Sequence, residues 1–333
     1  MGKKTYSFMM TRIFGFVVAT AGVLAISTGV ARADSDYPTG PVRIIVPFSA
    51  GGSTDQIARS LADGLGKLWK KPVVIENREG ANGTIGARVV SEAKADGYTL
   101  LFGTQTTLTV MPYILPSIPY DADKDFSPIT ELVNAAQLLS VPKASKFNSL
   151  KDLIDYAKAH PGELNYGGGY GATTDMAMRL LMSKAGVDLQ GIPYKGSALA
   201  MNDLLGGRLD TMFDVVTTSL PHVQSGGLRA LAVTSESRFE PLPDVPTVAE
   251  QGYPGFKTNV WFGLFAPAGT PADIIQKISD DSRSVLNEPE RKKNLTSSGF
   301  RIVASEPAAF TKLVEEENKT WSGLVKAYNM KMQ

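Results

Sequence analysis

The amino-acid sequence predicts an α/β protein with two domains. Apolar runs of strand length alternate with helical patterns over residues 42–103, and the alternation resumes over residues 164–234. Such alternation is typical of parallel β-strands that are joined by helices. A chain of 333 residues is also long enough for two domains of ordinary size. We therefore expect two mostly parallel sheets, each flanked by helices.

The first series of elements begins with the apolar run Val42–Phe48, which predicts a buried strand. Leucine and isoleucine then recur at helical spacing, and Ser53 with Gln56 has the pattern of a capping box. The elements expected next are a strand at Val73–Ile75, a helix at about Thr84–Ala95 with Ile85, Val89 and Val90 facing inward, a strand at Thr99–Gly103, a connecting loop at Pro112–Pro128 and a strand at Leu132–Val141.

The second series repeats this alternation. It begins with a helix at Leu150–Ala159, for which Ser149 is a suitable N-cap. The elements expected next are a strand at Leu164–Tyr166, a helix at Asp175–Ala185, a strand at Gly191–Tyr194, a helix at Ser197–Leu205 that Ser197 caps, and strands at Leu209–Val215 and Leu228–Thr234.

The last third of the chain is expected to complete the first domain. An apolar strand at Trp261–Ala266 would return the chain to that domain, and helices are predicted at Ile274–Leu286 and Pro307–Ala327. We therefore predict a discontinuous first domain, residues 34–133 and 260–333, with the second domain, residues 134–259, inserted into it. The two crossings would form a two-stranded hinge.

The amino terminus has the pattern of a secretory signal peptide. Lys3, Lys4 and Arg12 precede the apolar stretch Ile13–Val30, and Ala31-Arg32-Ala33 matches a small-residue cleavage site. An uncleaved membrane anchor fits this pattern less well. We expect cleavage after Ala33, which leaves a chain with 30 basic and 33 acidic residues. Such a balance suggests neither a nucleic-acid partner nor a membrane-surface partner.

The chain contains no cysteine and only two histidines, His160 and His222. The absence of cysteine excludes disulfides, thiol catalysis and most zinc sites. Each histidine lies in a turn or short segment, where a surface or capping position is the simplest interpretation. There is no P-loop, no G-x-S-x-G, no H-E-x-x-H and no complete dinucleotide-binding pattern. The sequence thus predicts no catalytic residue, no metal site and no cofactor.

Two segments have nearly the same sequence, and each follows a predicted strand and opens a helix. They are Gly51-Gly52-Ser53-Thr54-Asp55 and Gly171-Ala172-Thr173-Thr174-Asp175, about 120 residues apart. Helix starts carry unpaired N–H groups and partial positive charge, so they bind anions. Two of them could close on one ligand. The alternative for the first segment is that Ser53 only caps its helix and Asp55 only complements the helix dipole.

An aspartate in such a segment places negative charge close to the proposed anion, which counts against a strongly charged ligand. The second segment also contains Gly167–Gly169 and Tyr170. So many glycines cost conformational entropy, and a plain strand-to-helix turn rarely needs them. A ligand-binding role is the better interpretation there. Substitutions such as Gly52→Val or Gly171→Val are expected to abolish binding and to leave the fold largely intact.

Several longer stretches resemble the periplasmic solute-binding proteins of tripartite tricarboxylate transporters, the Bug receptors. The resemblance covers essentially all of the chain after the signal peptide. The stretches that carry it are YPTGPVRIIVPFSAGGSTDQIAR (37–59), VIENREGANGTIGA (74–87), GIPYKGSALAMNDLLGGRLDTMFD (191–214), LRALAVTSESRFEPLPDVPTVAEQGYPGF (228–256) and WFGLFAPAGTP (261–271). The resemblance implies a type II-like periplasmic-binding-protein clamshell, located in the periplasm, that closes on a small carboxylate.

In this family one loop from each domain grips the ligand carboxylate, largely through backbone groups and water. Carried over to this sequence, the resemblance implies a first loop at Phe48–Asp55 and a second at Gly169–Thr174. The family's serine-rich sequence and histidine in the second loop are replaced here by Thr173, Thr174 and Asp175. The ligand-binding residues expected are Phe48, Ser49, Ala50, Gly51, Gly52, Ser53, Thr54, Asp55, Asn82, Thr104, Gly169, Tyr170, Gly171, Ala172, Thr173, Thr174 and Asp214.

The expected function is a monomeric receptor that captures a small organic acid and delivers it to the integral-membrane subunits of such a transporter. A sensor that presents its loaded form to a signalling partner would use the same clamshell. A periplasmic enzyme is the third alternative, with Asp55, Asp175 or Asp214 as its general base. The ligand stays open among aliphatic di- or tricarboxylates, aromatic acids and amino acids. Phe48, Tyr170 and Trp261 would line a pocket for an aromatic acid, although each also suits a core or hinge position.

Overall fold

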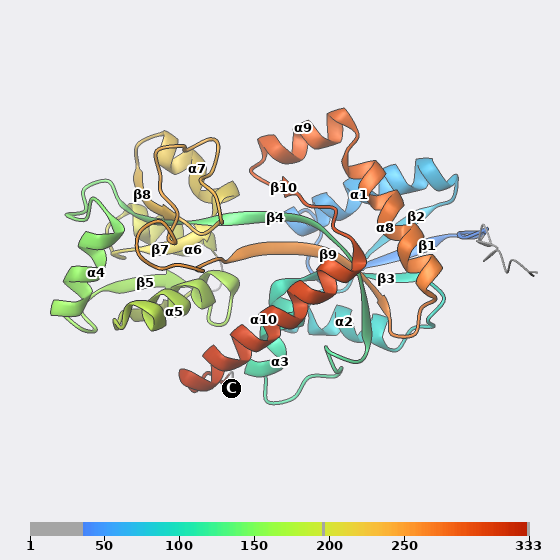
Figure 1. The fold of residues 1–333 in the computed structure, drawn as a ribbon, viewed down its shortest axis with the longest axis horizontal. Helices are drawn as coiled ribbons and strands as arrows, with labels where there is room; N and C mark the ends of the chain where they lie inside the picture. Colours follow the sequence, from blue (N-terminus) through green and yellow to red (C-terminus); the bar gives the residue numbers. More distant parts are fainter. Residues whose placement is uncertain (1–35, 195–196, 332–333) are drawn as a thin grey trace, which may run out of the picture. The chain divides into compact units, whose positions relative to one another are not determined.

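The computed structural model describes residues 36–194 and 197–331 (Figure 1). The predicted signal peptide and its cleavage site lie outside these residues. Strands and helices alternate along the chain as the sequence predicts, so the α/β class is confirmed. Among the residues described, no helix has the length and apolar character needed to cross a membrane.

The first strand group contains three parallel strands, with β1 (Val42–Val46) between β2 (Val73–Asn77) and β3 (Thr99–Thr104). Two long strands then join it in antiparallel pairing. β9 (Asn259–Pro267) lies between β3 and β4 (Phe126–Pro142), and the short β10 (Arg301–Ile302) pairs with the other side of β4.

The second strand group uses the remainder of the same strand β4. Residues 137–142 of β4 pair antiparallel with β7 (Met212–Val215) and β8 (Leu228–Val233). β5 (Asn165–Gly168) pairs in parallel with β6 (Gln190–Pro193), and Tyr166 forms a parallel bridge with Thr211. β4 therefore belongs to both groups. The sheets are mixed rather than mostly parallel, because β4 runs antiparallel to β7, β8, β9 and β10.

The helices match most of the predicted ranges. They are α1 (Ser53–Trp69), η1 (Ala81–Gly83), α2 (Thr84–Ser91), η2 (Thr106–Val110), α3 (Met111–Ile114), α4 (Leu150–Ala159), α5 (Thr173–Ala185), α6 (Ser197–Leu205), α7 (Val216–Gln224), α8 (Ala272–Leu286), α9 (Pro289–Ser297) and α10 (Pro307–Ala327). Ser149 caps α4 in a reciprocal capping box with Asp152, which confirms that N-cap.

Some local predictions were wrong. α1 has Gly52 as its N-cap without a side-chain cap, and Gln56 donates its side-chain amide to Gly51 O instead of closing a capping box. α2 ends at Ser91, and Ile85 is exposed because it lies on the outer face of that helix. The connection expected at 112–128 contains part of α3, and β4 already begins at Phe126.

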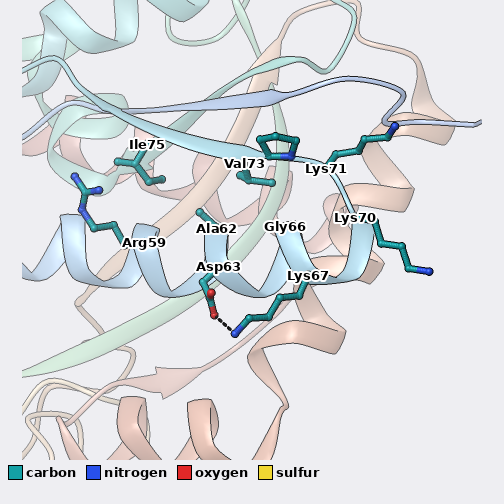
Figure 2. A pocket seen from close by; sticks show the side chains of 10 residues that line it. Arg59, Ala62, Asp63, Gly66, Lys67, Lys70, Lys71, Val73 and Ile75 are labelled. Carbon is teal, nitrogen blue, oxygen red and sulfur yellow. Dashed lines mark hydrogen bonds and ion pairs between the residues drawn. The ribbon is translucent and has the colours of Figure 1, made fainter.

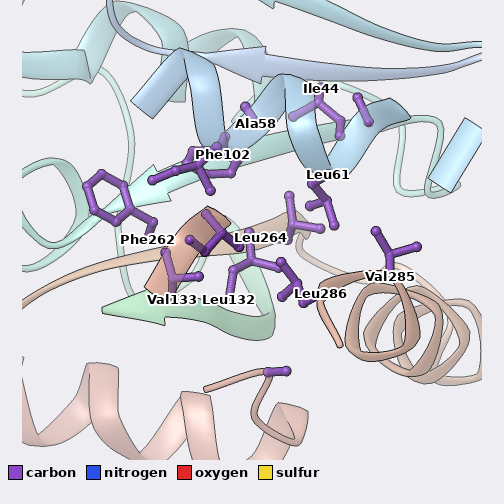
Figure 3. Packing of buried hydrophobic residues seen from close by; sticks show 14 of the residues in the cluster. Ile44, Ala58, Leu61, Phe102, Leu132, Val133, Phe262, Leu264, Val285 and Leu286 are labelled. Atoms are coloured by element: carbon purple, nitrogen blue, oxygen red, sulfur yellow. The ribbon is translucent and has the colours of Figure 1, made fainter. Parts of the chain in front are cut away.

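The core of the first strand group lies between the sheet and helices α1 and α8 (Figure 3). Ile44 and Phe102 come from β1 and β3, Leu264 comes from β9, and Leu61 and Leu286 come from the helices, all of them buried. Burying a side chain of this size contributes about 1.5–3 kcal/mol to stability. The first glycine-rich loop begins at the carboxyl end of β1, directly after this packed core.

Candidate functional site

The first glycine-rich loop is held by Asp55, whose side chain is almost fully buried. Gly51 adopts a positive φ of 88° and donates its N–H to Asp55 Oδ2 at 2.8 Å. Arg59 Nε donates to the same oxygen at 2.9 Å, and Asn77 Nδ2 donates to Oδ1 at 2.9 Å. The hydrogen bond from Arg59 is the main cause that lowers the pKa of Asp55 to about 2. Asp55 is therefore ionised, and its charge is compensated.

The second loop is built in the same way around Asp175. Gly171 has a positive φ of 71° and donates its N–H to Asp175 Oδ2 at 2.9 Å. Arg179 Nε donates to both carboxylate oxygens, at 3.1 and 3.0 Å, and the hydroxyl of Tyr166 donates to Oδ1 at 2.7 Å. Asp175 is likewise almost fully buried.

The two loops share a glycine, an aspartate four residues later and an arginine four residues after that. The sequence analysis noted the first two positions but missed Arg59 and Arg179, although the repeated spacing was visible. The geometry also corrects one expectation. Each aspartate accepts from its own loop and its own arginine, so its charge does not count against an anion in front of the loop.

Both helices that follow the loops begin without a side-chain cap. α1 starts after Gly52, and α5 starts after Ala172, which is held by its N–H bond to Gly169 O at 2.8 Å. The N–H groups of a first helical turn have no partner inside the helix, and they carry the positive end of its dipole. Each loop thus presents backbone donors suited to a carboxylate.

The rest of the first loop is fixed from β2 and its following turn. The carbonyl oxygen of Phe48 accepts from Asn77 Nδ2 at 2.9 Å, and the hydroxyl of Ser49 donates to Glu79. Ser49, Ala50, Gly51 and Gly52 are exposed, and Thr54 is half-buried. In the second loop, Thr173 is buried and Thr174 is half-buried.

Asn82 and Thr104 lie on different segments but meet through Thr107. The hydroxyl of Thr107 donates to Asn82 O at 3.1 Å and lies 3.1 Å from the hydroxyl of Thr104. Thr107 was not among the predicted site residues, because nothing distinguishes it from the other threonines in the segment 104–109. The three residues follow the carboxyl ends of β2 and β3, beside the end of β1, and such strand ends are where α/β proteins bind ligands.

Met111 connects these residues to the second loop. Asn82 Nδ2 lies 3.4 Å from Met111 Sδ, and a Cβ placed on Gly171 would lie 3.2 Å from Met111 Cε. Met111 therefore contacts Asn82 and lies close to Gly171, where an added Cβ would crowd it. The structure thus brings the second loop up to the carboxyl ends of the first strand group.

Asp214 lies at the end of β7 and holds two helix starts. It accepts hydrogen bonds from the hydroxyls of Ser197, at the start of α6, and Thr218, in the first turn of α7. Burial raises the pKa of Asp214 above its ordinary value, and these hydrogen bonds oppose the rise. Asp214 accordingly positions the segments around β7.

The three aromatic candidates lie in different surroundings. Trp261 is buried, and its Nε1 donates to Glu317 at 2.8 Å. It lines a hollow of about 160 Å³ together with Glu317 and Lys257, and the lining of that hollow includes neither glycine-rich loop. The ring of Tyr170 stacks 5.4 Å from the guanidinium of Arg179, and its hydroxyl accepts from Lys331 N at 3.2 Å. Phe48 is half-buried in the first loop.

Two hollows lie behind the loops. A shallow one of about 620 Å³ runs along the outer side of α1 and β2, with Arg59 at one end and Lys67, paired with Asp63, farther along (Figure 2). A smaller one of about 210 Å³ is lined by Tyr170, Arg179 and Tyr328. Within residues 36–194 and 197–331, no cluster of three acidic, histidine or cysteine side chains could hold a metal ion.

Comparison with known proteins decides the family. The model of the tripartite tricarboxylate transporter family receptor matches residues 57–330. The chain belongs to this receptor family. It is 36% identical over 329 residues to protein BugT of Bordetella pertussis, an alignment that covers 97% of this chain and 99% of BugT.

Solved structures support the same assignment of this receptor. Rpa4515 of R. palustris, determined with adipate, is 34% identical with a TM-score of 0.76, covering 89% of this receptor and 100% of that chain. MatC of Rhodopseudomonas palustris, with bound malate, is 32% identical with a TM-score of 0.73, covering 87% and 100%. These relatives are solute-binding proteins, and the receptor has their periplasmic-binding-protein fold.

Proposed function

We propose that this receptor binds a small organic dicarboxylate in the periplasm between its two glycine-rich loops and delivers it to the membrane subunits of a tripartite tricarboxylate-type transporter. The observation that carries the proposal is the matched construction of the loops around Asp55 and Asp175. The first loop follows the carboxyl end of β1, and Met111, which contacts Asn82, lies close to Gly171 in the second loop. Adipate and malate in the related structures supply the ligand class.

Binding would rest on neutral donors. The first-turn N–H groups of α1 and α5 and the hydroxyls of Thr54, Thr173 and Thr174 would satisfy one carboxylate group, with water filling the gaps. Arg59 and Arg179 are already paired with aspartates, so neither arginine is free to hold the anion. Such a grip would release its ligand readily, as a transport receptor must.

The proposed domains are residues 34–133 with 260–333, and residues 134–259. Strands β4 and β9 would act as the hinge. β4 belongs to both strand groups, and β9 pairs with β4 next to the point where β4 passes from one group to the other. Closure of the loops on the ligand would then be a rotation about these strands, driven by contacts made only in the closed form.

Titration calorimetry with adipate, malate, citrate, benzoate and aspartate tests the proposal. We expect saturable binding of at least one dicarboxylate by the purified receptor and none by a Gly52→Val variant. A Gly323→Val variant is the matched control, because Gly323 lies on an exposed face of α10 with no neighbour near its Cβ position. Failure of every acid to bind would refute the carboxylate assignment.

The proposal also treats the receptor as non-catalytic. Prolonged incubation with the bound acid followed by mass spectrometry should recover the acid unchanged, and turnover would establish the enzyme alternative. Amino-terminal sequencing of exported protein should begin at Asp34.

A further inference from the structure

The carboxyl-terminal segment reaches the second glycine-rich loop from behind. α10 packs along β4 and the segment 106–114, and its far end also contacts α5 (Figure 1). Trp321, Leu324 and Met330 from this segment are buried in one cluster with Met111 and with Met176 of α5. A helix that packs on the first strand group thus also supports the helix that follows the second loop.

The contact centres on Arg179, the arginine that pairs with Asp175. Its guanidinium lies 5.4 Å from the ring centre of Tyr170 and 5.6 Å from that of Tyr328, within the range of cation–π attraction. The hydroxyl of Tyr328 donates to Arg179 O at 3.2 Å. Lys331 N donates to the hydroxyl of Tyr170 at 3.2 Å, so the tail also holds the loop tyrosine.

The first loop lacks this support. The side chain of Arg59 is 53% exposed, at the edge of the hollow in Figure 2, whereas that of Arg179 is 15% exposed. Both loops share the glycine N–H bond and the arginine bond to the aspartate, whereas the third donor is Asn77 in the first loop and Tyr166 in the second. The aromatic pair at Arg179 is therefore an addition specific to the second loop, and its outer member comes from residue 328, far along the sequence.

We infer that Tyr328 is a positioning residue for ligand binding. It fixes the side chain of Arg179, which in turn holds the carboxylate of Asp175. That carboxylate accepts from the Gly171 N–H and so fixes the second loop. This inference rests on the proposed function for its ligand. The carboxyl-terminal segment is thereby part of the second half of the binding site, although it packs on the first strand group. A change that weakens the packing of this segment therefore lowers the affinity for the ligand, although it removes no group that contacts the ligand.

Hydrogen exchange of the ligand-free receptor tests the inference without any ligand. Tyr328→Leu keeps apolar bulk but loses the aromatic face and the hydroxyl, and Tyr328→Phe keeps the face. We expect amides of residues 169–175 to exchange about three- to tenfold faster in Tyr328→Leu, and close to wild type in Tyr328→Phe. Residues 49–55 form the loop that Tyr328 does not support, so they serve as the internal control and their exchange should not change. Equal acceleration in both loops, or none in the second, would overturn the inference.

A second arm measures affinity for adipate by calorimetry. Tyr328→Leu should weaken binding about three- to tenfold and Tyr328→Phe should restore it. Tyr98→Ala is the control, because Tyr98 precedes β3 at the end of that strand opposite Thr104. If wild-type receptor binds no organic acid, the proposed function fails while the exchange experiment still decides the role of Tyr328. Unchanged adipate affinity in Tyr328→Leu would contradict the inference alone.

Discussion

The backbone N–H of Gly171 donates a hydrogen bond to the carboxylate of Asp175 at 2.9 Å. The same bond joins Gly51 to Asp55 at 2.8 Å. An acceptor four residues downstream thus fixes a glycine whose positive φ turns the chain into the helix. The aspartates orient the loops, and the helix N–H groups remain for a ligand.

Loss of Asp175 should cost more stability than loss of Asp55. Asp175→Asn leaves the guanidinium of Arg179 in a largely buried site without its counter-charge, which costs about 3–5 kcal/mol. Asp55→Asn leaves an exposed Arg59 that water can solvate, so the loss is about 1–2 kcal/mol. Urea unfolding of both variants measures the difference. Equal losses would mean that the two arginines are solvated alike.

Gly52→Val and Gly171→Val should behave differently. Gly52 has an ordinary negative φ, and its Cβ position lies 3.8 Å from the nearest atom, so valine blocks the loop without straining the fold. Gly171 has a positive φ, and its Cβ would lie 2.8 Å from Ile114 Cδ1. Valine there should also destabilise the fold by about 1–3 kcal/mol. Thermal melts separate the two cases, and an unchanged melting temperature for Gly171→Val would contradict this reading.

Glu317 should make stability fall as pH rises. Burial raises the pKa of this carboxyl to about 7, and the hydrogen bonds from Trp261 and Gln105 only partly oppose the rise. The folded form therefore holds a proton that the unfolded form releases. The contribution of Glu317 to stability is thus fully present below about pH 4.5 and is lost as pH rises to about 7. The decline from this group amounts to about 2–4 kcal/mol.

Glu317→Gln is the variant that checks this. Gln105 Oε1 is buried without a partner among the described residues, so a rotated Gln105 amide could accept from the new glutamine. Denaturation at pH 5 and pH 8 should show a smaller difference in the variant than in the wild type. The same difference in both proteins would assign the titration to other groups.

Thr107→Val should weaken binding through Asn82 and Thr104. Valine keeps the shape of threonine but removes the hydroxyl that contacts both residues, at a cost of about 1–2 kcal/mol in stability. If Asn82 contacts the ligand, affinity should fall several-fold. Thr320→Val, on the exposed face of α10, removes a comparable hydroxyl far from the site. Identical calorimetric affinities for Thr107→Val and wild type would exclude Asn82 and Thr104 from the ligand contacts.

Much of the fold could be predicted from local sequence patterns. The apolar run at Val42 and the glycine-rich starts of α1 and α5 depend on neighbouring residues, so their structure could be read from the sequence. The direction of β4 and β9 could not, because antiparallel pairing such as Ala135 with Val260 joins residues more than 100 positions apart. No local pattern reports such a partner.

In the candidate site, too, features set by neighbouring residues could be predicted and features set by distant partners could not. The loop glycines and threonines stand together in the sequence, and Tyr166 lies on the strand just before the second loop, whereas Asn77 reaches Asp55 from the separate strand β2. The burial of Trp261 also depends on α10, which supplies the acceptor Glu317. Long-range contacts of this kind decided which aromatic side chains were available to a ligand.

Strand β9 has a consequence for the order in which the chain acquires its structure. It lies between β3 and β4, so neither of these strands has its inner partner until residues 259–267 have been synthesised. The edges of β3 and β4 that pair with β9 therefore stay unpaired in the emerging polypeptide for most of translation. A nascent chain in that state is pliable enough to be threaded through a membrane channel, and it is also most in need of a chaperone.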